Sequence, residues 1–131
     1  MFYKIIIVLC LLLPLVAFAA KPTITTELEI VRSPNIKVYA FEKVLDRWGD
    51  KQWIHFSNLI DKEGSNWDSK AKNPNSTAYG IGQFLDSTWK TVDCIKTDDK
   101  YKQIDCTIDY IEARYDTPVG AIKFHNKNNW Y

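Results

Sequence analysis

The chain has 131 residues, of which 17 are Lys or Arg and 16 are Asp or Glu, giving a formal net charge of +1 at pH 7. This balance argues against nucleic acid as a partner, because nucleic-acid binding requires a basic surface. It also provides no general electrostatic attraction to an anionic membrane. The length suits one compact domain with its own hydrophobic core.

Residues 1–19 have the pattern of a secretory signal peptide. Lys4 gives a positive start, Ile5 to Leu13 form a short apolar core, and Ala17-Phe18-Ala19 supplies the small residues of a cleavage site. The apolar run is shorter than the about 20 residues that a membrane span needs. We therefore expect cleavage before Ala20, export to the periplasm or the medium, and no stable membrane insertion afterwards. An uncleaved N-terminal anchor is the alternative.

Two cysteines remain after this cleavage, Cys94 and Cys106. An even pair in an exported domain predicts a disulfide, and closing so short a loop contributes roughly 3 kcal/mol in the chain-entropy model. Two free, buried thiols are the alternative. Because no histidine stands beside either cysteine, the pair makes a poor zinc site, and we expect no metal and no other cofactor.

Residues 20–47 form a lead-in segment that begins without helical periodicity. A minor edge strand is expected at 27–31. A short helix is expected from Ile36 to Trp48. This helix would bury Val38, Phe41 and Leu45, which recur at spacings of three and four.

The strongest helical pattern starts at Asp50, a natural N-cap, and continues to Glu63. The apolar residues along one face of this helix are Trp53, Phe56, Leu59 and Ile60. Glu63 continues the same face, and Gly64 is expected to end the helix.

The rest of the chain predicts a polar connection and further helices. Residues 65–78 are polar and contain a turn-forming run at 73–76. Two of the expected helices cover 86–92 and 102–115. A last helix is expected to start at Thr117-Pro118, an N-cap followed by proline at the first helical position, and to continue through Phe124. The sequence therefore predicts a mainly all-α fold, a small helical domain.

Glu63 is the candidate catalytic residue. Cleavage of a glycosidic bond begins with protonation of the leaving oxygen, which calls for an acid whose pKa is raised by apolar burial. The helical pattern places Glu63 among apolar side chains. The alternative is a structural carboxylate that accepts backbone hydrogen bonds at a helix end.

The run Tyr79 to Phe84 is the candidate substrate-binding segment. Gly80 and Gly82 let the backbone approach a ligand closely. Gln83 offers a donor and an acceptor to a sugar, and Tyr79 and Phe84 can pack on sugar faces. The alternative is a tight turn that leads into a core helix.

Three stretches of residues together resemble a known family. They are 63–68 (EGSNWD), 71–89 (AKNPNSTAYGIGQFLDSTW) and the tail 103–131, with its run YIEARY and its closing Trp130-Tyr131. In combination they resemble the lytic transglycosylase-like, lysozyme-like domain of bacteria and their phages. The resemblance covers about residues 48 to 131, which we take as the catalytic domain.

The resemblance implies a lysozyme-like fold with a groove for peptidoglycan glycan strands. It implies cleavage of the β-1,4 bond between N-acetylmuramic acid and N-acetylglucosamine by one glutamate without a metal, and this role falls on Glu63. The acid would protonate the glycosidic oxygen and then act as base while the muramyl 6-hydroxyl closes a 1,6-anhydro ring. The absence of an obvious second carboxylate fits this route.

Eight residues are expected to contact the substrate. Ser65 stands for the family's serine, Tyr110 would present its hydroxyl, and Asn126 lies where the family's Ala-Tyr-Asn motif is missing. With the glycine-rich segment, the set is Ser65, Tyr79, Gly80, Gly82, Gln83, Phe84, Tyr110 and Asn126. Tyr115 and His125 are expected to be packed side chains.

One departure from the family concerns the catalytic position. The family has serine directly after the glutamate, whereas here Gly64 separates Glu63 from Ser65. Either Gly64 is an insertion after the helix end, or Trp67 sets the register and Gly64 occupies the catalytic position. A hydrolytic muramidase and a non-catalytic peptidoglycan-binding homologue are therefore the alternative functions. An envelope-spanning assembly is a candidate partner.

Overall fold

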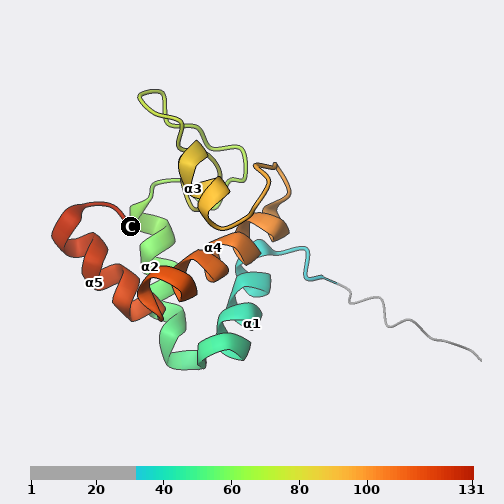
Figure 1. Cartoon of the computed structure of the whole chain (residues 1–131). Helices are drawn as coiled ribbons and strands as arrows, with labels where there is room; N and C mark the ends of the chain where they lie inside the picture. Colours follow the sequence, from blue (N-terminus) through green and yellow to red (C-terminus); the bar gives the residue numbers. More distant parts are fainter. Residues whose placement is uncertain (1–31) are drawn as a thin grey trace, which may run out of the picture. The chain divides into compact units, whose positions relative to one another are not determined.

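The computed structural model describes residues 32–131, which belong to one compact helical unit (Figure 1). The elements are α1 (Ile36–Trp48), the 3₁₀ turn η1 (Asp50–Gln52), α2 (Trp53–Lys62), α3 (Asp86–Thr91), α4 (Lys100–Tyr115) and α5 (Pro118–Asn128). Within this part of the chain extended pairing is limited to isolated bridges of Tyr79 with Lys72 and Phe84. The prediction of a mainly all-α fold is confirmed.

Two predictions fall on residues that the structure does not describe. They are the signal peptide at 1–19 and the edge strand at 27–31. Across residues 32–131, no helix is both long enough and apolar enough to cross a membrane.

Local capping explains where several helices begin. Asn35 accepts a hydrogen bond from the backbone N–H of Lys37 at the start of α1, and Asp99 caps α4 through the N–H groups of Tyr101 and Lys102. Thr117 caps α5, whose first residue is Pro118, as the sequence predicts.

The predicted N-cap at Asp50 is wrong. Gly49, with φ +89°, turns the chain after α1, and Asp50 then opens the 3₁₀ turn η1. Helix α2 begins at Trp53, and Gln52, the residue before it, forms no side-chain cap to α2. The Gln52 side chain instead accepts a hydrogen bond from the N–H of Val119 at 3.0 Å, so it caps the start of α5.

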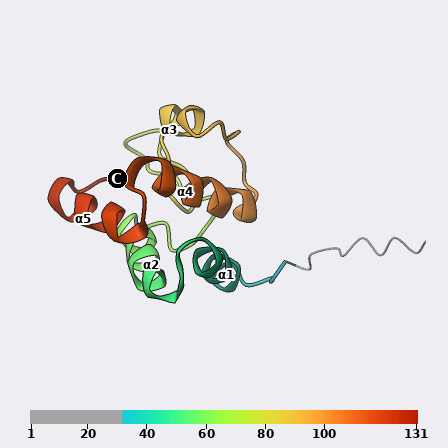
Figure 2. The same ribbon diagram turned by 60° about the horizontal axis from the view of Figure 1, so that its bottom comes forward.

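The main core lies where α4 meets α1 and α5, and where α2 packs along α5 (Figures 1 and 2). Phe56, Leu59 and Ile60 of α2 are fully buried, which confirms the predicted apolar face of this helix. Ile104 and Ile111 of α4 are fully buried in the same cluster.

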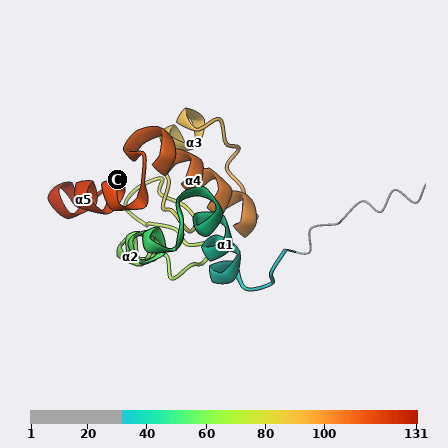
Figure 3. The ribbon, with the colours of Figure 1, turned by 90° about the horizontal axis from the view of Figure 1, so that it is seen from below.

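Helix α1 has its predicted bounds but buries a different face. Val38, Phe41 and Leu45 are 42, 36 and 45% exposed. The buried residues are Tyr39, Ala40 and Val44, which pack towards α4, the neighbour of α1 in Figure 3. Small side chains one turn apart let the two helices approach closely, and the Tyr39 hydroxyl donates to Asp105 of α4 at 2.8 Å. The compact unit therefore includes α1, part of the segment that the sequence placed in the lead-in.

A smaller cluster lies beside α3. Its buried members are Tyr79, Phe84, Trp89, Cys106 and Tyr110. The disulfide Cys94–Cys106, with Cα atoms 6.3 Å apart, ties the loop after α3 to α4. The predicted disulfide is confirmed.

Candidate functional site

Glu63 lies at the C-terminal end of α2. Its backbone N–H donates to the carbonyl of Leu59 at 3.2 Å, so it completes the last helical turn. Gly64 follows with φ +72° and open space around it, which ends the helix. The side chain of Glu63 is 17% exposed, so the carboxyl lies at the edge of the core.

Burial raises the pKa of Glu63 to about 7. The cause is desolvation of the carboxylate, which disfavours its charged form. Nε2 of His125 lies 3.2 Å from Oε1 of Glu63. Burial also lowers the pKa of His125, with a further contribution from Lys62. Burial therefore disfavours the charged form of both groups.

Two tyrosines complete the surroundings of Glu63. Burial raises the pKa of Tyr115, and that of Tyr131 well above its ordinary value, and in both the charge of Glu63 adds to the shift. Tyr131 donates a hydrogen bond to the carbonyl of Gly82 at 3.2 Å. Within residues 32–131, the Tyr115 hydroxyl and Oε1 of Glu63 have no hydrogen-bond partner of good geometry. Both atoms are buried, so each is a polar group whose hydrogen-bonding capacity is unused in this structure.

Sequence reasoning did not assign His125, Tyr115 or Tyr131 to the site. His125 comes from α5, Tyr115 from the end of α4, and Tyr131 from the end of the chain. Their meeting with Glu63 depends on how α5 packs on α2 and α4, which no local pattern encodes. The one available signal is that a histidine and two tyrosines lie within the short stretch 115–131.

Ser65 connects Glu63 to the glycine-rich segment. Its hydroxyl donates to the carbonyl of Ile81 at 2.8 Å and accepts from the N–H of Trp67 at 3.3 Å. Ser65 is buried, so in this structure it fixes the backbone after α2. Its predicted contact with substrate stays a prediction.

The segment 79–84 is a tight turn. Tyr79 and Phe84 exchange backbone hydrogen bonds of 3.1 and 3.2 Å. Gln83 has φ +49°, and its side-chain amide donates to the carbonyl of Gly80 at 2.8 Å. The side-chain N–H of Gln83, expected to donate to a sugar, therefore donates within the turn. The Gln83 side chain nevertheless remains partly exposed.

The two glycines of this turn are explained by packing against α4. A Cβ atom on Gly80 would lie 2.5 Å from the Gln103 side chain, and one on Gly82 would lie 2.8 Å from the Thr107 hydroxyl. Gly80 also has φ +79°, which favours glycine. The close approach that the sequence predicts is thus to protein side chains, and approach to a ligand stays a prediction.

Phe84 and Tyr110, like Tyr79, are members of the smaller cluster. Phe84 is buried and packs edge-to-face on Trp89 and Tyr110, with ring centroids 5.3 and 5.1 Å apart. Tyr110 is also buried, and its hydroxyl accepts from Arg114 at 2.8 Å. Both side chains therefore pack in the interior beside the turn. Direct contact with a sugar stays a prediction for each.

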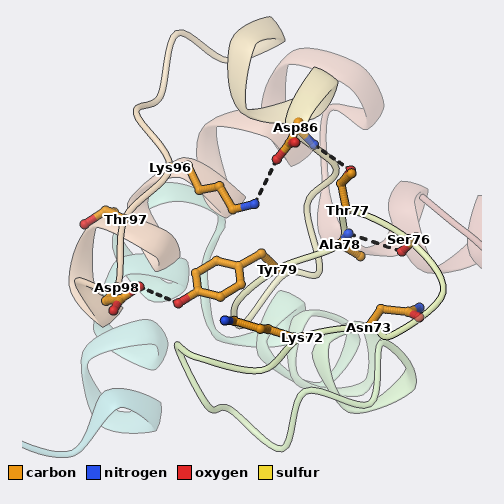
Figure 4. Close-up of a pocket in the computed structure, with 10 residues that line it drawn as sticks. All are labelled: Lys72, Asn73, Ser76, Thr77, Ala78, Tyr79, Asp86, Lys96, Thr97 and Asp98. Carbon is orange, nitrogen blue, oxygen red and sulfur yellow. Dashed lines mark hydrogen bonds and ion pairs between the residues drawn. The ribbon is translucent and has the colours of Figure 1, made fainter.

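Tyr79 lines a polar cavity of about 580 Å³ (Figure 4). Its hydroxyl donates to Asp98, and Nζ of Lys96 lies 5.0 Å from the centre of its ring. Lys96 also pairs with Asp86 at 2.8 Å. Figure 4 shows Lys72 on the other side of the tyrosine from Lys96.

Asn126 lines a separate cavity of about 640 Å³ between α2 and α5, together with His55, Lys62 and Ile122. Neither Glu63 nor the turn 79–84 lines it. The structure thus gathers Ser65 and the turn close to Glu63 but leaves Asn126 on a different surface. Among residues 32–131, no group of three or more His, Cys, Asp or Glu side chains is arranged to hold a metal ion.

Comparison with known proteins gives no match: no family model, no curated protein and no solved structure matches the chain.

Proposed function

We propose that this protein cleaves peptidoglycan glycan strands as a lytic transglycosylase, with Glu63 as the catalytic residue. The observation that carries the proposal is the buried carboxyl of Glu63, whose pKa is raised to about 7. An acid with such a pKa is protonated and still strong enough to donate near neutral pH. The sequence resemblance supplies the substrate class, and with it a lysozyme-like fold and a glycan-binding groove.

The reaction needs one group in two roles. Glu63 first gives its proton to the glycosidic oxygen between N-acetylmuramic acid and N-acetylglucosamine, and the bond to the anomeric carbon breaks. The carboxylate then takes the proton of the muramyl 6-hydroxyl as this oxygen attacks the anomeric carbon. A 1,6-anhydro ring forms, and Glu63 returns to its protonated state.

The neighbours of Glu63 suit this cycle. Tyr131 holds the carbonyl of Gly82 in place, and the buried Tyr115 hydroxyl has no hydrogen-bond partner within residues 32–131. Nε2 of His125 lies 3.2 Å from Oε1 of Glu63, and burial disfavours the charged form of this imidazole. Asp61, the nearest other carboxylate in sequence, is hydrogen-bonded to the indole of Trp67, so a two-carboxylate mechanism has less support.

The test is digestion of purified sacculi, with the products weighed by mass spectrometry. Wild type should release muropeptides one water lighter than those released by a hydrolytic lysozyme. The variant Glu63→Gln should lose about 1,000-fold in rate, because it has no proton to donate. Glu112→Gln, at an exposed glutamate paired with Arg47, is the matched control and should keep full activity.

The outcomes separate the alternatives. Products of full mass would identify a hydrolytic muramidase, and binding to sacculi without release would identify a non-catalytic homologue. An active Glu63→Gln variant would refute the catalytic assignment. Export is part of the proposal, and a mature N-terminus at Ala20 in the secreted protein would support it.

A further inference from the structure

The cavity beside Tyr79 is rich in charge of both signs. Lys72 and Lys96 line it together with Asp86 and Asp98 (Figure 4). Hydroxyl groups of Ser76 and Thr77 lie on the same wall. At about 580 Å³ its size falls within the range of roughly 300–1,000 Å³ that small-molecule sites occupy.

This cavity does not offer an aromatic platform for a sugar ring. Tyr79 is only 8% exposed, and its hydroxyl is already paired with Asp98. Lys96 also covers the ring, with Nζ 5.0 Å from its centre. A ligand of this cavity would therefore meet charges and hydroxyls.

The charges are accessible. The side chains of Lys96 and Asp86 are 42 and 54% exposed, and such exposed pairs hold together weakly. Lys72 is exposed and forms no ion pair with another residue of the described part of the chain. A ligand can thus place one carboxylate on Lys72, another on Lys96 and an ammonium group on Asp86 at little cost, and charge-assisted hydrogen bonds would hold each group.

The cavity lies at the paired ends of the turn 79–84, and Ser65, two residues after Glu63, donates to the carbonyl of Ile81 inside this turn. Tyr79 starts the turn, and Gly82 within it is held by Tyr131, a neighbour of Glu63. In peptidoglycan, a short peptide that carries carboxylates and a free amino group branches from the same muramyl sugar that the reaction attacks. A strand with its scissile bond at Glu63 would carry this peptide towards one side of the turn.

We infer that this cavity binds the zwitterionic part of the peptidoglycan stem peptide, with separate carboxylates on Lys72 and on Lys96 and its ammonium on Asp86. The inference rests on the proposed function for its substrate class. Under this inference the protein recognises the stem peptide and also cleaves the glycan strand.

Rates on two substrates test the inference. Glycan strands that keep their stem peptides should be cleaved about tenfold faster than strands stripped by an amidase. The double variant Lys72→Gln/Lys96→Gln should lower this ratio to about one without slowing cleavage of stripped strands. Lys90→Gln, an exposed lysine of α3 outside the cavity, should keep the wild-type ratio. An unchanged ratio in the double variant overturns the inference.

A binding measurement tests the cavity independently of catalysis. The soluble tetrapeptide of alanine, glutamate, diaminopimelate and alanine should shift the backbone amide signals of Thr77, Tyr79 and Lys96 in NMR spectra. The double variant should show no such shifts, and neither should a peptide amidated at its carboxylates. If wild type cleaves neither substrate, the proposed function fails, and the NMR titration alone then tests the inference about the cavity. The absence of shifts at millimolar peptide would overturn that inference.

Discussion

Burial of Glu63 couples its ionisation to folding. The pKa of this carboxyl is about 7 in the folded protein against an ordinary value of 4.5. Below pH 4.5 the group is protonated in both states, whereas between pH 4.5 and 7 only the unfolded chain releases the proton. The free energy of unfolding therefore falls as pH rises through this window. Allowing for partial solvent screening, we expect a loss of roughly 2 kcal/mol.

Urea unfolding of wild type and Glu63→Gln at several pH values measures this loss. The variant should gain stability relative to wild type by roughly 2 kcal/mol between pH 4 and pH 8. Parallel pH profiles would show that the carboxyl is not desolvated in solution.

The residues around Glu63 show what a sequence can and cannot reveal. The burial of Glu63 follows from helical spacing within α2, because Leu59 and Ile60 are fully buried on the same face. The contact with His125 does not, since it joins positions on two helices far apart in the chain. Local periodicity predicts which side of a helix faces inward, and only tertiary packing decides what it meets there.

At the scale of elements, the turn 79–84 depends on its fit against α4. The buried amide of Gln103 donates to the carbonyls of Ser69 and Thr97 at 2.8 and 2.6 Å and accepts from the N–H of Ile81 at 2.8 Å. Gly80 leaves the space that this amide fills. One side chain of α4 thus joins three loop segments.

Replacing Gly80 by alanine should therefore be costly. The new Cβ atom would displace the Gln103 amide, and the backbone would keep an unfavourable positive φ. We expect a loss of about 3 kcal/mol in the free energy of unfolding. Gly64→Ala is the matched control, because its φ is also positive but nothing lies within 4 Å, and it should lose about 1 kcal/mol. Equal losses in urea unfolding would show that the Gln103 contact is unimportant.

Helix α1 shows why spacing alone can select the wrong face. Val38, Phe41 and Leu45 have a helical repeat and larger side chains than Ala40, yet they remain partly exposed. Ala40 and Val44 are buried because close approach of two helices requires small side chains at the crossing. The identity of the partner helix, and not the hydrophobicity of α1, decides this face.

For the molecule as a whole, the sequence predicts the helices and the disulfide but not the division of the interior. The local signal Thr117-Pro118 predicts the start of α5 correctly, whereas α5 ends at Asn128 and not at Phe124, and α2 begins at Trp53 and not at Asp50. Two separate apolar clusters form because α3 contributes little beyond Trp89 to the interior. This division becomes visible only when residues distant in the chain are brought together.

The disulfide is one of the links between the smaller cluster and the rest of the domain. Cys94 follows α3 and Cys106 lies within α4, twelve residues later. Because the bridge restricts the unfolded chain, its removal should lower the free energy of unfolding by roughly 3 kcal/mol. The double variant Cys94→Ala/Cys106→Ala measures this loss, and wild type in reducing agent separates the cross-link from the loss of the buried sulfur atoms. Reducing agent should lower the stability of wild type and leave the variant unchanged; an equal effect on both, or none on either, would mean that the smaller cluster holds to α4 without the bridge.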